Sequence, residues 1–167
     1  MKPTRLQETT PFDWVVWFKW IIATTFGWIV AAILFSALPT IAAGFILGFL
    51  QWLVLEYRIR QAWRWIVASA IGWVTGGSIV YLLALTDQGI LAGLIIGVTT
   101  GIAEWLILRG EVLWAGWWIP ISMIAWTTGI GLIPGFFSTG AVAGAISGLA
   151  LIILLPNARA LPNPEDM

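Results

Sequence analysis

Six apolar stretches of about 20 residues follow one another along this chain, with very short connections between them. A helix needs about 20 consecutive apolar residues to cross the hydrocarbon core of a bilayer. The stretches are 15–37, 40–57, 63–85, 89–108, 113–134 and 138–156. Because 60% of the 167 residues are hydrophobic and 10% are charged, a soluble domain of this size could not bury its apolar side chains. The sequence therefore predicts an all-α polytopic membrane protein with six transmembrane helices.

The positions of Lys and Arg predict the orientation of these helices, since cytoplasmic connections are enriched in both residues. If the six stretches alternate in direction, every Lys and Arg falls on one side: Lys2, Arg5, Lys19, Arg58, Arg60, Arg64, Arg109 and Arg159. Asp87 is the single formal charge expected on the other side. We therefore expect a cytoplasmic N-terminal segment over 1–13, a transmembrane domain over 14–157 and a cytoplasmic tail over 158–167.

Two motifs recur three times and predict that the unit of the fold is a helical hairpin. Odd-numbered stretches carry two Trp separated by seven residues, as KWIIATTFGW (19–28), RWIVASAIGW (64–73) and WWIPISMIAW (117–126). Even-numbered stretches carry GFILGFLQWLVL (44–55), GVTTGIAEWLIL (97–108) and GAISGLALIILL (144–155). The three predicted hairpin repeats span about 14–57, 62–109 and 113–156.

Glycines four residues apart form a stripe on each even-numbered stretch. In lipid, small residues let two helix backbones approach closely, and helix association depends on that contact. The predicted helix-packing positions are Gly44, Gly48, Gly93, Gly97, Gly101, Gly140, Gly144 and Gly148. Such seams can join helices within one chain or join two protomers. We favour packing within the chain, because six short spans need seams inside the bundle.

Gln51 and Glu104 are the candidate buried polar positions. Each follows the second glycine of its motif by three residues, so both are expected to share the glycine face and point into the bundle. Three roles are open for them: hydrogen bonding, proton or ion handling, and ligand contact. We favour hydrogen bonding, because Gln and Glu share a carbonyl acceptor rather than a titratable proton. The donor would be an indole N–H of a neighbouring helix, or Lys19 or Arg64.

Tryptophan is abundant, with 13 residues, and many lie beside the charged ends of the stretches. An indole at a membrane interface keeps its N–H in water and its ring in lipid. The sequence thus predicts an interfacial belt made of Trp14, Trp17, Trp20, Trp63, Trp65, Trp114, Trp117 and Trp118.

The composition argues against an enzyme. The chain has no cysteine and no histidine, so thiol nucleophiles, imidazole bases and the usual zinc and haem ligands are missing. We expect no catalytic residue, no metal site and no cofactor. With a formal net charge of zero and no long basic run, nucleic-acid binding is not expected either.

The paired motifs, WRWIVASAIGW with GxxxGxxQWLVL, resemble repeats of uncharacterised small multi-pass proteins from bacteria, notably cyanobacteria and related phototrophs. The resemblance covers nearly all of residues 17–155. It implies a bacterial plasma-membrane or thylakoid protein and no particular activity. Leu151 and Ile152 replace the Gln/Glu–Trp pair in the third copy, so a site built on that pair is not threefold.

Two other families bear on function. Substrate-binding subunits of energy-coupling vitamin transporters are similar in length and number of spans, which keeps transport as an alternative. Light-harvesting helices carry Glu and Arg five residues apart around a pigment ligand, as EWLILR at 104–109 does in part. Ile107 stands where that ligand belongs, so pigment binding is not expected.

The function predicted from these features is that of a non-catalytic accessory, assembly or scaffold component of a membrane complex. Its expected partners are the lipid bilayer and other membrane proteins or a second copy of the chain. The alternatives are a small transporter or substrate-binding subunit, and an ion- or proton-handling protein that uses Glu104.

Overall fold

The computed structural model describes residues 13–34 and 40–157, and these form six α-helices. The helices are α1 (Trp14–Leu34), α2 (Thr40–Leu55), α3 (Arg64–Leu82), α4 (Gly89–Leu108), α5 (Trp118–Trp126) and α6 (Ser138–Leu154). No strand occurs in the described residues, so the all-α prediction is confirmed. Most of the predicted N-terminal segment and all of the predicted tail lie outside the described residues, as do Lys2, Arg5 and Arg159.

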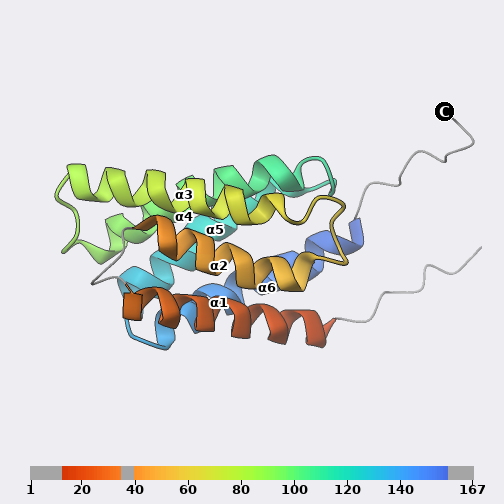
Figure 1. Cartoon of the computed structure of the whole chain (residues 1–167), viewed down its shortest axis with the longest axis horizontal. Coiled ribbons are helices and arrows are strands. Elements are labelled where there is room, and N and C mark those ends of the chain that lie inside the picture. Colours follow the sequence, from red (N-terminus) through yellow and green to blue (C-terminus); the bar gives the residue numbers. More distant parts are fainter. Residues whose placement is uncertain (1–12, 35–39, 158–167) are drawn as a thin grey trace, which may run out of the picture.

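The helices lie side by side and alternate in direction (Figure 1). Each helix packs against the next one in the sequence, and α6 packs against α1, so the bundle closes into a ring. The start of α1, the α2–α3 and α4–α5 connections and the end of α6 all lie at one end of the bundle (Figure 1). The α3–α4 and α5–α6 connections lie at the opposite end.

Three helices, α1, α3 and α4, are long and apolar enough to cross a membrane by length and composition. The six expected spans are therefore reduced to three by these criteria, since α2 and α6 have 16 and 17 residues. The α-helical part of the fifth stretch, α5, has only nine residues. A 3₁₀ turn, Ala115–Trp117, precedes α5, and a π-helical segment, Thr127–Leu132, follows it.

Two features accompany the π-helical segment: its own glycines and a hydrogen bond from α6. Its sequence, TTGIGL, contains two glycines, which favour an α-helix poorly. The Thr139 hydroxyl on α6 donates to the Gly129 carbonyl oxygen at 3.0 Å, so a side chain on another helix occupies that acceptor. The fifth stretch therefore stays helical over 115–132 while its hydrogen-bond pattern changes.

Two layers of three indoles fill the centre of the ring. In the first layer, Trp20, Trp65 and Trp118 pack edge to face, with ring centroids 5.8, 6.1 and 5.5 Å apart. In the second layer, the corresponding distances are 6.1, 6.1 and 5.0 Å for Trp28, Trp73 and Trp126. Edge-to-face pairs are favoured by the ring quadrupole. The repeated Trp pair is thus the core motif of the odd-numbered helices.

This finding corrects part of the predicted interfacial belt. Trp20, Trp65 and Trp118 have exposures of 0, 0 and 1%, so they lie in the core and not at an interface. The prediction was wrong for these three because it used their distance from charged residues and ignored which helix face they occupy. Four of the remaining belt residues are well exposed: Trp14, Trp63, Trp114 and Trp117.

The glycine stripes pack inside the chain, each even-numbered helix against the odd-numbered helix that follows it in the ring. A Cβ added at Gly44 would lie 2.7 Å from the Ser69 carbonyl oxygen of α3, and one at Gly97 would lie 2.6 Å from Met123 Cα of α5. Gly144 faces Ile21 of α1 at 3.0 Å. The same three seams contain Gly48, Gly93, Gly101, Gly140 and Gly148.

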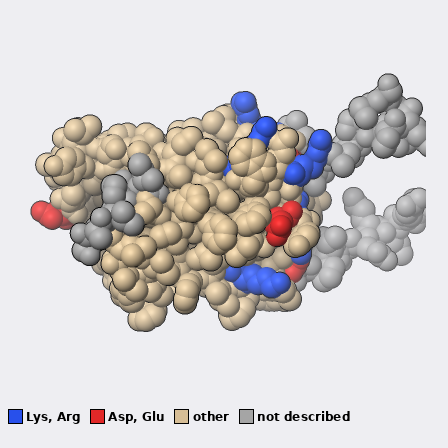
Figure 2. Space-filling view, in the orientation of Figure 1, with Lys and Arg blue, Asp and Glu red and all other residues tan. Residues whose placement is uncertain are grey.

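The outer surface carries no charged side chain over most of its length (Figure 2). Lys and Arg gather at the end that holds the α2–α3 and α4–α5 connections, and a wide uncharged band separates them from the opposite end (Figure 2). Many large hydrophobic side chains are exposed, and Phe18, Phe26 and Ile71 are among them at about 60%. Exposed apolar side chains in this number are typical of a surface that contacts lipid or another protein.

Candidate functional site

Gln51 lies inside the bundle on α2, where it links α1 to α3. Its Oε1 accepts a hydrogen bond from the Trp65 indole N–H at 3.0 Å, and its Nε2 donates to Thr24 Oγ1 at 3.1 Å. The Gln51 side chain is buried, and both ends of its amide have partners. A satisfied buried amide costs little to hold and fixes the three helices relative to one another.

Glu104 lies at the corresponding position of α4 and links α3 to α5. The Trp118 indole N–H donates to Oε2 at 2.8 Å, and the Ser69 hydroxyl donates to Oε1 at 2.8 Å. Glu104 is also buried, with an exposure of 6%. No Lys or Arg forms an ion pair with it anywhere in the described part of the chain, where the ion pair present joins Arg58 to Asp13.

The third hairpin uses a different acceptor. Leu151 stands where Gln51 and Glu104 would be and is fully buried. The Trp20 indole N–H instead donates to Ser147 Oγ at 2.9 Å, one helical turn earlier on α6. Ser147 Oγ in turn donates to the Ala143 carbonyl oxygen at 2.7 Å. All three indoles of the first layer therefore have an acceptor on the neighbouring even-numbered helix.

The odd-numbered helices also supply a hydroxyl at a fixed position, which the analysis of the sequence missed. Thr24, Ser69 and Ser122 each lie four residues after the first Trp of the motif, so indole and hydroxyl share one helix face. The signal was present in the aligned motifs, because all three carry a hydroxyl residue there. Lys19 and Arg64, the alternative donors considered for this site, have exposed side chains instead.

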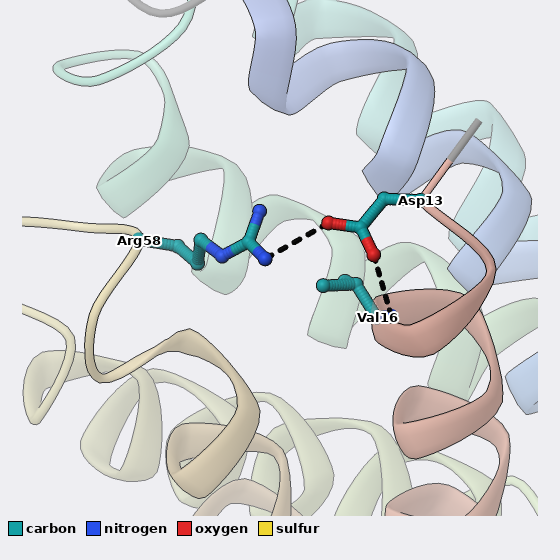
Figure 3. Close-up of polar contacts among 3 residues, drawn as sticks. All are labelled: Asp13, Val16 and Arg58. Atoms are coloured by element: carbon teal, nitrogen blue, oxygen red, sulfur yellow. Dashed lines mark hydrogen bonds and ion pairs between the residues drawn. The ribbon is translucent and has the colours of Figure 1, made fainter. Parts of the chain in front are cut away.

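A second polar site lies at the charged end of the bundle (Figure 3). Asp13 Oδ1 accepts from the Val16 backbone N–H at 3.1 Å, and Oδ2 accepts from Arg58 Nη2 at 2.9 Å. Asp13 thereby caps α1 and ties it to the α2–α3 connection. The Val16 N–H, followed by the Arg58 guanidinium, holds the Asp13 pKa below its usual value. This exposed pair organises a helix end rather than a reaction centre.

An apolar groove of about 410 Å³ runs along the outer side of α5 and α6. It is lined by Trp114, Trp117, Ile121, Ala150, Ile153 and Leu154. Apart from the two indole N–H groups, its lining has no polar side chain. The groove therefore offers apolar contact and no titratable group for chemistry.

The described residues contain no cluster of three or more His, Cys, Asp or Glu that could hold a metal ion. No protein-family model, curated protein or solved structure matches the chain.

Proposed function

We propose that this chain is an integral membrane protein that acts as a non-catalytic accessory, assembly or scaffold component of a membrane complex. In this proposal six helices cross the bilayer as three repeated hairpins around a pseudo-threefold axis, with both termini in the cytoplasm of a bacterial cell. The uncharged band in Figure 2 and the Lys and Arg side chains gathered at one end support the orientation. The resemblance to cyanobacterial-type multi-pass proteins is part of the same proposal.

The observation that carries the functional proposal is the filled axis of the ring. Transporters and channels place a polar path or substrate site near the centre of the bundle. Here Trp20, Trp65 and Trp118 occupy the centre in mutual contact, and the second indole layer lies two helical turns away. The polar atoms of Gln51 and Glu104 form hydrogen bonds with side chains of neighbouring helices and do not line a lumen. In this proposal the outer surface, which contacts other proteins, carries the function.

The orientation is tested by placing single cysteines in a chain that naturally has none. Asp87→Cys and Gly116→Cys put one thiol in the α3–α4 connection and one near the α4–α5 connection. In inside-out vesicles, a membrane-impermeant maleimide should label position 116 and spare position 87. Intact spheroplasts should give the reverse pattern. Labelling of both positions from the same side would refute the proposed topology.

The scaffold role is tested by photocrosslinking from the outer face of each hairpin in intact membranes. A photoreactive amino acid replaces Phe18, Ile71 or Ile124, which are exposed residues on α1, α3 and α5. We expect a defined protein adduct from one face and lipid adducts from the other two. The same protein reconstituted in liposomes should not conduct ions or protons above the protein-free rate. Lipid adducts from all three faces, together with solute flux, would favour the transport alternative.

A further inference from the structure

The surroundings of Gln51 and Glu104 differ in one chemical respect. On both helices, one side-chain oxygen accepts an indole N–H, and the other polar atom meets a hydroxyl of the preceding odd-numbered helix. At Gln51 that second atom is an N–H donor directed at Thr24 Oγ1. At Glu104 it is Oε1, 2.8 Å from Ser69 Oγ. A protonated carboxyl has the same donor and acceptor pattern as the amide.

Within the described residues, no Lys or Arg forms an ion pair with Glu104. On α3 the charged residue is Arg64, whose guanidinium lies 5.9 Å from the exposed Trp63 ring centroid, and α5 carries no charged residue. Beyond the end of α4, Arg109 stacks on the Trp105 ring at 5.3 Å. An unpaired carboxylate is expensive in an apolar interior, and proteins commonly avoid that cost by keeping the group neutral.

We propose that Glu104 is a proton-binding site, at which the neutral carboxyl donates its proton to Ser69 Oγ as Gln51 Nε2 donates to Thr24 Oγ1. Ser69 Oγ then accepts in this contact, where it would donate to an ionised carboxylate. The Trp118 N–H keeps its bond to Oε2. Loss of the proton leaves a buried negative charge between α3, α4 and α5.

Infrared spectroscopy of the full chain in lipid nanodiscs tests this site directly. At neutral pH, the wild-type protein should show the carbonyl stretch of a protonated carboxylic acid, and this band should shift when glutamate is ¹³C-labelled. Glu104→Gln should abolish the band. Glu56→Gln, which changes an exposed glutamate, should leave it unchanged. Absence of the band from the wild-type protein would overturn the proposal, whatever the variants do.

Exchanging Gln51 and Glu104 provides a second test, which does not require the Glu104→Gln variant to fold. Gln51→Glu should add a second protonated carbonyl of comparable intensity, because its site already accommodates a donor next to Thr24. The double exchange Gln51→Glu/Glu104→Gln should keep one band and unfold at the same denaturant concentration as the wild type. An ionised carboxylate at position 51, or an exchange variant that has lost its fold, would contradict the equivalence of the two sites.

Discussion

The Trp118 indole N–H donates to Glu104 Oε2 at 2.8 Å across the contact between α5 and α4. The Trp118 ring also packs against Trp20 and Trp65. One side chain therefore belongs to the first indole layer and also binds the buried carboxyl group of Glu104. Removing the donor leaves a buried acceptor unsatisfied, and this lowers the free energy of unfolding by more than an average hydrogen bond contributes.

Trp118→Phe should therefore lower the free energy of unfolding by at least about 1–3 kcal/mol, the typical cost of leaving a buried polar group unsatisfied. Equilibrium unfolding in mixed micelles, followed by Trp fluorescence and helicity, measures this loss. Trp117→Phe is the matched control, because the neighbouring indole is 61% exposed. Equal losses for the two variants would show that the bond to Glu104 contributes nothing specific.

Gly97→Ala should also destabilise the bundle, by about 1–3 kcal/mol as expected for overpacking. The added Cβ would lie 2.6 Å from Met123 Cα and 2.7 Å from the Ser122 carbonyl oxygen, and both are backbone atoms that cannot move aside alone. Gly116→Ala is the control, since nothing lies within 4 Å of its added Cβ. The midpoint of thermal unfolding should fall for the first variant and stay unchanged or rise for the second.

Ser147→Ala should remove the acceptor of the Trp20 indole N–H and cost about 1–3 kcal/mol. Leu151→Gln alone should also destabilise, because it buries an amide while Ser147 already holds the indole. The double variant places a glutamine where α2 has Gln51 and should recover part of the combined loss. Strict additivity of the two single effects would show that position 151 cannot reach Trp20.

The Asp13 pair predicts a pH dependence at the charged end. Because the folded-state pKa of Asp13 is lowered, its stabilising contribution is present above the unfolded-chain value, about 4, and is lost as the pH falls through the folded-state pKa. Asp13→Asn should remove this acid-dependent loss. Arg58→Gln should only reduce it, since the Val16 N–H is the larger cause. Unfolding midpoints between neutral and acidic pH would show whether the three curves differ in this order.

The sequence predicted much of the architecture because its constraints are local. Apolar stretches bounded by charge and short polar connections indicate helices directly. The spacing of glycine and of Gln51 or Glu104 places these residues on one helix face without knowledge of the neighbours. The structure brings that face to the ring interior, with Gln51 and Glu104 buried beside the seams.

What the sequence did not predict depends on contacts between distant hairpins. A Trp beside a charged residue reads as interfacial, and only the closing of the ring turns Trp20, Trp65 and Trp118 toward one another. The Ser147 acceptor replaces the missing polar group at position 151 from one turn away, which motif alignment cannot reveal. The π-helical segment likewise depends on Thr139, a residue of the following helix.

The ring closes through α6 and α1 with the same kind of glycine seam that joins α2 to α3 and α4 to α5. The α6–α1 contact between the last and first hairpins is therefore packed like the α2–α3 and α4–α5 contacts, although only the latter two join helices that are consecutive in the chain. A trimer of separate hairpins could be held together by the same three seams. One continuous chain additionally allows its hairpins to differ in sequence, as Leu151 and Ile152 of the third hairpin do where the first two carry Gln51–Trp52 and Glu104–Trp105.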